Sequence, residues 1–130
     1  MRAVQSNSRL LVAALTACVL SFYGTPAVAQ EDASARASRM AYELAMKCFV
    51  ANGVARGDSR DASNEADASA FERRARRSFD VASALGDKLG YSGGRINQDF
   101  GLAQGEELPK FVRDKDYLGR TEETCKSAGL

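Results

Sequence analysis

The sequence predicts an all-α fold, a small up-down bundle of about four helices stapled by one disulfide between the first and the last helix. Alanine and straight-chain residues dominate the chain and β-branched residues are sparse, which favours helix over strand. Apolar residues recur three and four positions apart over long stretches, as on one face of an amphipathic helix. Two widely separated cysteines, Cys48 and Cys125, supply the pair that can form the staple.

The first 29 residues have the organisation of a cleavable secretory signal peptide. Arg2 and Arg9 lie in a polar start, residues 10–23 form an uncharged apolar run, and Ala27-Val28-Ala29 matches the small-residue pattern that precedes a signal-peptidase site. An apolar run of about 14 residues is shorter than the roughly 20 that a bilayer-spanning helix needs. We therefore expect cleavage after Ala29, a periplasmic or secreted protein, and no permanent transmembrane helix after cleavage.

A lipoprotein is the alternative for the same segment. Leu15-Thr16-Ala17-Cys18 resembles a lipoprotein box, in which Cys18 would be lipidated and would anchor the mature protein. Residues 19–23, which are mostly apolar, would then follow the anchor where a polar tether is expected. Simple export is therefore the favoured prediction.

Residues 30–130 are predicted to form a single helical domain. Cleavage leaves 101 of the 130 residues and removes two of the 18 basic side chains but none of the 17 acidic ones, so the formal charge becomes −1. Such a domain buries only about 60–65% of the surface of its unfolded chain and is marginally stable without a staple. Cys48 and Cys125 are its only cysteines, and an even count in an oxidising compartment indicates a disulfide. A redox-active pair would instead be expected at C-x-x-C spacing.

The first helix is expected over about 33–52 and is expected to be largely buried. Its apolar stripe at helical spacing consists of Ala37, Met40, Ala41, Leu44, Cys48 and Ala51, widened by Tyr42, Met46 and Phe49. Asn52-Gly53 and Gly57 are typical helix-ending residues, and the side chains expected to cap the next helix are Asp58, Ser59 and Asp61.

The second helix, expected over about 61–89, has the most regular pattern in the chain. Its apolar seam is spaced alternately by three and four and consists of Ala68, Phe71, Ala75, Ser78, Ala82, Leu85 and Leu89. Bulky side chains alternate there with Ala and Ser, which lets a neighbouring helix approach closely. Gly90 is the expected residue that ends it.

The last forty residues predict two shorter helices. A stripe of Ile96, Phe100 and Ala103 begins a third helix near Gly94, which the sequence predicts to break or kink at Leu108-Pro109. The final helix is expected to start at Asp114 or Asp116 and to end at Gly129. Its inward side chains would be Tyr117, Leu118, Thr121 and Cys125.

Composition excludes most familiar catalytic chemistries. The chain has no histidine, which removes Ser-His-Asp triads, Cys-His pairs and His metal ligands. Neither phosphate-binding glycine fingerprint occurs, and the acidic stretch that begins at Asp58 lacks the Gly and Glu of a calcium loop. Near-balanced charge argues against nucleic acid as a partner. We expect no catalytic set, no metal site and no cofactor.

The sharpest local feature is the run Arg73-Arg74-Ala75-Arg76-Arg77. On a helical wheel the arginines lie away from the apolar seam, and Glu72 and Asp80 partly neutralise Arg76. The favoured interpretation is a solvated helix face. The functional alternative is a contact with an anionic surface or an acidic partner, made by Arg73, Arg74 and Arg77.

The sequence as a whole favours a non-enzymatic exported protein that acts by binding an unknown envelope partner. It is similar in type to small single-disulfide helical proteins of bacterial envelopes, which include acid-stress chaperones and immunity proteins, so an envelope-interaction, inhibitor or chaperone-like role is expected. One alternative is a carrier of a small apolar ligand in a pocket lined by Met40, Leu44, Phe71 and Phe100. The other is a carboxylate-dependent hydrolase, for which the available acids include Glu106, Glu107, Asp114 and Asp116.

Overall fold

A computed structural model describes residues 27–130, with side chains from residue 33 onward, and this part of the chain contains helices and no strand. The four helices are α1 (Ala27–Asp61), α2 (Glu65–Lys88), α3 (Gly93–Arg113) and α4 (Lys115–Ser127). The predicted all-α bundle is therefore confirmed. The predicted signal peptide and Cys18 lie outside the described residues, apart from residues 27–29 at the start of α1.

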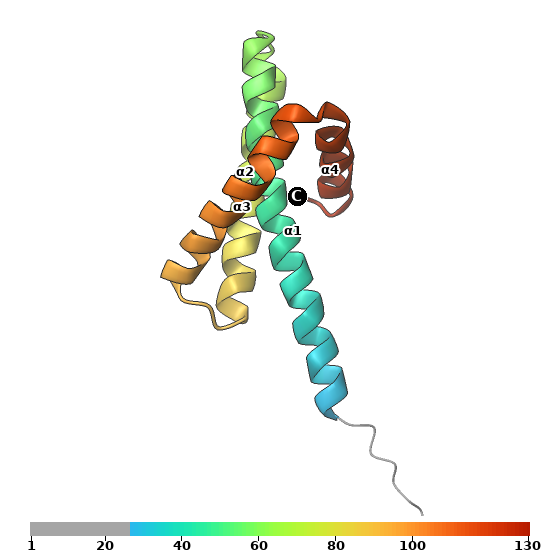
Figure 1. Ribbon diagram of the computed structural model, residues 1–130, viewed down its shortest axis with the longest axis vertical. Coiled ribbons are helices and arrows are strands. Elements are labelled where there is room, and N and C mark those ends of the chain that lie inside the picture. Colours follow the sequence, from blue (N-terminus) through green and yellow to red (C-terminus); the bar gives the residue numbers. More distant parts are fainter. Residues whose placement is uncertain (1–26) are drawn as a thin grey trace, which may run out of the picture.

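Helix α1 is the central element of the bundle because most of the contacts between helices involve it, above all those with α2. In Figure 1, α2 returns antiparallel along α1, and α3 and α4 lie on different sides of α1. The N-terminal half of α1 extends beyond the other helices. The other three helices therefore cover the C-terminal half of α1 and leave its beginning uncovered.

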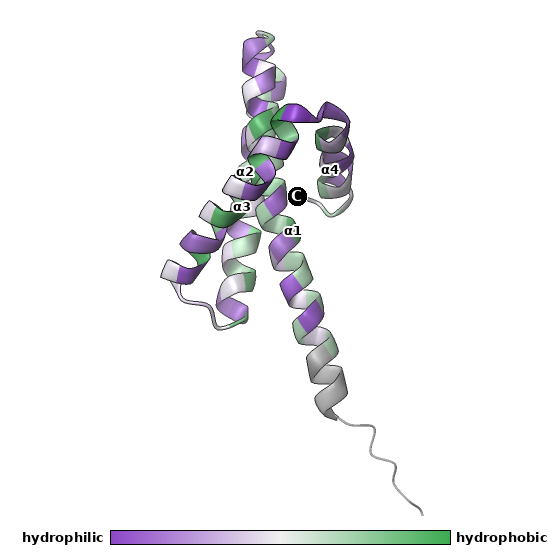
Figure 2. Ribbon diagram, in the orientation of Figure 1, coloured by the Kyte–Doolittle hydropathy of each residue, from purple (hydrophilic) through white to green (hydrophobic). Residues whose placement is uncertain are grey.

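The apolar stripe of α1 is buried only where other helices cover it. Cys48 and Ala51 are buried, whereas Ala37, Met40 and Ala41 are exposed. In Figure 2, hydrophobic and hydrophilic residues alternate along the turns of this projecting half. The expectation of a largely buried first helix is thus wrong for its N-terminal half, because α2, α3 and α4 do not extend that far.

The predicted end of α1 at Asn52-Gly53 or Gly57 is also wrong, since the helix continues to Asp61. Ala51 and Ala55 are buried on either side of Gly53, so burial against the bundle outweighs the cost of about 1 kcal/mol for each interior glycine. The predicted caps of α2 are wrong as well. The Asn64 side chain caps α2 by accepting a hydrogen bond from the Asp67 backbone N–H at 3.1 Å.

The predicted seam of α2 faces the core. Ala68, Ala75, Ser78 and Ala82 are buried, and the larger seam side chains Phe71, Leu85 and Leu89 are half-buried. Gly90 ends the helix with φ +76, a conformation that glycine adopts without steric cost, as predicted. Small residues on the buried line let α1 and α2 pack closely along their length.

Gly86 is the point where the helices leave no room for a side chain. A Cβ there would lie 2.7 Å from Cδ1 of Ile96 on α3 and 3.1 Å from Cε2 of Tyr42 on α1. We expect Gly86→Ala to lower the free energy of unfolding by about 1–3 kcal/mol, because Ile96 must shift. Gly101→Ala is the matched control, since its Cβ would meet nothing within 4 Å.

The control should raise the free energy of unfolding by about 1 kcal/mol through helix propensity alone. Urea unfolding followed by circular dichroism measures both changes. If the two alanine variants were stabilised equally, the close approach at Gly86 would be disproved.

Helix α3 runs through Pro109 without ending. Of the two predicted outcomes at Leu108-Pro109, a break is wrong, and a kink stays a prediction. Phe111, two residues later, is 0% exposed, and its burial favours continuation of the helix past the proline. Asp114 then separates the two last helices, and its carboxylate accepts a hydrogen bond from the Tyr117 N–H at 2.8 Å. Of the two predicted starts, Asp114 and Asp116, the structure selects Asp114, which caps α4. The helix ends at Ser127, two residues before the predicted end at Gly129.

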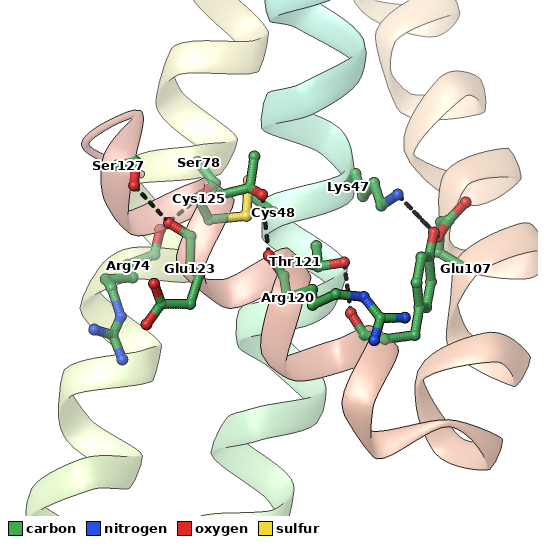
Figure 3. The surroundings of a disulfide bond; sticks show 12 residues. Lys47, Cys48, Arg74, Ser78, Glu107, Arg120, Thr121, Glu123, Cys125 and Ser127 are labelled. Atoms are coloured by element: carbon green, nitrogen blue, oxygen red, sulfur yellow. Dashed lines mark hydrogen bonds and ion pairs between the residues drawn. A yellow bond between two sulfur atoms is a disulfide. The ribbon is translucent and has the colours of Figure 1, made fainter.

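The predicted disulfide joins α1 to α4. Cys48 and Cys125 are bonded, with Cα atoms 5.6 Å apart and both side chains buried in the main core cluster. Of the predicted inward residues of α4, Leu118 and Thr121 are buried and Tyr117 is half-buried. Figure 3 shows the disulfide between these two helices.

Candidate functional site

A groove of about 560 Å³ lies between α1 and α3. In Figure 1, α1 and α3 diverge from one another toward their N-terminal ends. The α1 wall carries Arg39, Met40, Glu43, Leu44 and Lys47, and the α3 wall carries Arg95, Asp99, Leu102, Glu106 and Glu107. Tyr42, Met46, Tyr91 and Ala103 complete the lining.

Two large apolar side chains stand exposed on the facing walls of the groove. Met40 on α1 is 64% exposed and Leu102 on α3 is 56% exposed. Single exposed apolar residues are common on proteins, but two that line one hollow from opposite sides form a surface that a partner can cover.

A hydrogen-bonded network of Tyr42, Arg95 and Asp99 lines one part of the groove. The Tyr42 hydroxyl donates to Oδ2 of Asp99 at 2.9 Å, and Nε of Arg95 donates to the same oxygen at 3.3 Å. The Arg95 guanidinium also lies 4.4 Å from the ring centre of Tyr91. Burial, together with the hydrogen bond to Asp99 and its negative charge, raises the pKa of Tyr42 well above its ordinary value. Tyr42 is thus a neutral hydrogen-bond donor.

A second network lies around Glu107. Lys47 Nζ donates to the Tyr117 hydroxyl at 2.6 Å, and that hydroxyl donates to Oε2 of Glu107 at 2.8 Å. Lys110 Nζ donates to the other carboxylate oxygen at 2.8 Å. Burial alone would raise the pKa of Glu107, but the hydrogen bonds from Lys110 and Tyr117 and the charge of Lys47 lower it. Glu107 is therefore held as a carboxylate.

The structure separates the four residues predicted to line a carrier pocket. Met40 and Leu44 line the groove. Phe100 instead packs against Phe49 and Phe79, with ring centres 5.1 Å and 4.8 Å away, and Phe71 lies under the Arg74 guanidinium. The predicted four-residue lining is wrong, because Phe100 faces the Phe49 side of α1 and Phe71 is far along α2.

The three arginines singled out from the sequence, Arg73, Arg74 and Arg77, do not form one exposed patch. Arg73 and Arg77 are exposed, and Arg77 Nη1 donates to the Gly129 carbonyl at 3.4 Å. Arg74 is half-buried, with its guanidinium 4.3 Å from the Phe71 ring centre. The expectation that Arg74 is solvated is wrong, because its position on the helix lies nearer the apolar seam and is covered there.

Of the four acidic residues considered for a hydrolase, two line the groove and two lie elsewhere. Glu106 and Glu107 line the groove, whereas Asp114 caps α4 and Asp116 is exposed. In the part of the chain that the structure describes, no three His, Cys, Asp or Glu side chains are grouped so that they could hold a metal ion. None of the helices in this part is long and apolar enough to cross a membrane.

Sequence reasoning missed most of the groove. Tyr42 and Asp99 are 57 positions apart and Lys47 and Tyr117 are 70 apart, so no local pattern links them. The only local signal was the exposed end of the α1 stripe, which contains Met40 and Leu44.

Comparison with protein-family models, with curated proteins and with solved structures finds no match. In residues 27–130 the protein is a bundle of four helices with a disulfide between α1 and α4 and an open, partly apolar groove between α1 and α3.

Proposed function

We propose that the protein is an exported, non-enzymatic binding protein whose groove between α1 and α3 receives an amphipathic helix of a partner protein in the cell envelope. The observation that carries this proposal is the exposure of Met40 and Leu102 on the two facing walls of the groove. Covering them would remove apolar surface from water, at about 25 cal/mol per Å².

The shape of the site favours a helix as the occupant. Both walls are helices held by the bundle, and a third helix laid between them would complete a local three-helix arrangement. An amphipathic helix binds such a groove through apolar anchors spaced at i, i+3, i+4 and i+7. The flexible thioether of Met40 can adapt to anchors of different shape.

The charges on the two walls indicate which charges a partner helix would carry on its two sides. On α1 the basic residues Arg39 and Lys47 outnumber Glu43. The α3 wall has the opposite balance, with three carboxylates, including Glu106, against Arg95. A partner helix with acidic residues toward α1 and basic residues toward α3 is complementary, and this asymmetry would fix its direction.

Two further observations support the proposal. The Cys48–Cys125 disulfide is compatible with an oxidising compartment, as expected for a protein with the predicted signal peptide at 1–29. Tyr42 is held neutral and Glu107 is held ionised by their neighbours, so both suit fixed hydrogen bonding better than proton transfer.

A photo-crosslinking experiment tests the groove directly. A photoreactive amino acid is placed at Leu102 in the full chain, and the crosslinked peptide from envelope preparations is identified by mass spectrometry. We expect an amphipathic helical segment with acidic and basic flanks, and a synthetic copy of it should bind at least tenfold more weakly to Leu102→Glu.

Val112 provides the control position. It lies on the same helix, is 58% exposed and does not line the groove. Val112→Glu should leave binding of the peptide unchanged. Equal crosslinking from both positions, or full binding by Leu102→Glu, would refute the groove as the binding site.

A further inference from the structure

A second, smaller pocket lies on another side of the molecule and shares no residue with the groove. It has a volume of about 440 Å³ and is formed by Asn52 of α1, Arg74 of α2, and residues of α4. The α4 residues are Gly119, Glu122, Glu123 and Lys126. Figure 3 labels Arg74 on α2 and Glu123 on α4 among the residues around the disulfide.

Two residues that line this pocket, Asn52 and Arg74, each carry a buried hydrogen-bond donor that has no partner. Asn52 is 2% exposed, and its Nδ2 is buried without a hydrogen bond. Nε of Arg74 is buried without one as well, and no other buried side-chain nitrogen or oxygen in residues 33–130 lacks a partner. Buried polar groups are nearly always paired, so two unpaired donors lining one pocket indicate a place for acceptor oxygens.

The outer part of the pocket carries charges of both signs. Glu123 and Lys126 are exposed and Glu122 is half-buried, so these groups lie nearer solvent than the two donors. Burial raises the pKa of Glu122 and the charge of Arg74 opposes that rise. With Arg74 and Lys126 against two glutamates, the lining is balanced in charge.

The lining fits a ligand that has one charge of each sign. A simple anion could pair with the inner donors but would be repelled by Glu122 and Glu123. A simple cation could approach those carboxylates but would leave the Asn52 and Arg74 donors unpaired. A carboxylate is the acceptor that matches a guanidinium, and an ammonium group matches carboxylates.

We propose that this pocket binds a small zwitterion of the α-amino acid class. The ligand carboxylate accepts hydrogen bonds from Asn52 Nδ2 and from the Arg74 guanidinium, and its ammonium group lies against Glu122 and Glu123. Gly119 leaves the α4 wall open, since a Cβ there would meet nothing within 4 Å. This site is independent of the helix-binding groove.

Nuclear magnetic resonance titration of the full chain with glycine tests the proposal. We expect saturable shifts of the Asn52 side-chain amide and the Arg74 Nε–H signals. Acetate, which has only the carboxylate, and methylammonium, which has only the cation, should each bind at least tenfold more weakly. Acetate that bound as tightly as glycine, or glycine that gave no saturable shift, would refute the zwitterion site.

Three variants separate binding from folding. Asn52→Leu keeps the branched side-chain shape and removes the donor. Arg74→Met keeps an unbranched apolar side chain and removes the guanidinium that lies over the Phe71 ring. Each should weaken glycine binding roughly tenfold or more, because one charge-assisted or buried hydrogen bond is lost.

Arg73→Met is the matched control, since Arg73 is exposed and does not line the pocket. It should bind glycine like the unmodified protein. Thermal unfolding monitors the fold of all three variants, and Asn52→Leu should unfold at the same or a higher temperature because an unpaired buried donor has been removed. Unchanged glycine binding by folded Asn52→Leu and Arg74→Met would overturn the assignment.

Discussion

Replacement of both bonded cysteines, Cys48→Ala together with Cys125→Ala, is expected to lower the free energy of unfolding by about 4–5 kcal/mol. The bond joins residues separated by 77 positions, so it restricts most of the helical domain in the unfolded chain. For a domain of this size each kcal/mol shifts the thermal midpoint by about 4–8 °C. A fall of about 20 °C or more in differential scanning calorimetry is therefore expected.

Chemical reduction of the disulfide provides the control for this prediction. Adding a reductant should lower the midpoint of the unmodified protein and leave that of the double-alanine variant unchanged. Mass spectrometry without reduction should find the Cys48–Cys125 linkage and, in exported material, an N-terminus at Gln30. A midpoint that does not respond to loss of the bond would show that the helices hold together without it, and a lipidated Cys18 would overturn the predicted simple export.

Phe111→Ala is expected to have the next largest effect, a loss of about 3–5 kcal/mol in the free energy of unfolding. The Phe111 ring is 0% exposed, belongs to the cluster of Val50, Ala51 and Leu118, and stacks on Tyr117 with ring centres 5.2 Å apart. Truncation would leave a cavity where α1, α3 and α4 meet. Urea unfolding should show a lower midpoint with an unchanged slope.

Val112→Ala is the neighbouring control for this prediction. Val112 is exposed, so its truncation should change the free energy of unfolding by less than about 0.5 kcal/mol. Similar small effects at both positions would mean that α3 is not docked beyond Pro109. The pair of variants therefore tests whether α3 is packed against the bundle beyond the proline.

The features predicted well from the sequence are those that a short stretch of chain decides. Helical spacing places the apolar seam from Ala68 to Leu89 on one face of α2. Gly90 ends this helix because glycine readily takes a positive φ, and Asp114 caps α4 because its carboxylate accepts a backbone hydrogen bond. The disulfide was predictable because cleavage of the expected signal peptide leaves only two cysteines.

The features predicted wrongly are those where burial outweighs local preference. Gly53, Gly57 and Pro109 all disfavour helix, yet α1 and α3 continue through them because Ala55 and Phe111 are buried further along. The stripe around Met40 was expected to be buried, but helical periodicity says only which face is apolar and not whether a neighbour reaches it.

In the candidate sites, too, local sequence decides some features and packing against distant helices decides others. Arg74 was singled out by its place in an arginine run, but its buried Nε and its position beside Asn52 depend on α4 lying over this part of α1 and α2. No pattern in the sequence marked Asn52 as a donor without a partner, since it had the appearance of a helix-ending residue.

By itself the sequence determined the helical class, the apolar faces and the pair of cysteines, because spacing, propensity and cysteine count act within each segment of chain. Only the tertiary structure decided where α1 and α3 end, which part of the α1 stripe stays exposed beside Leu102, and which donors meet in the Asn52–Arg74 pocket. These depend on the lengths and directions of helices that are distant in sequence, since burial by a neighbouring helix outweighs local preference by a few kcal/mol.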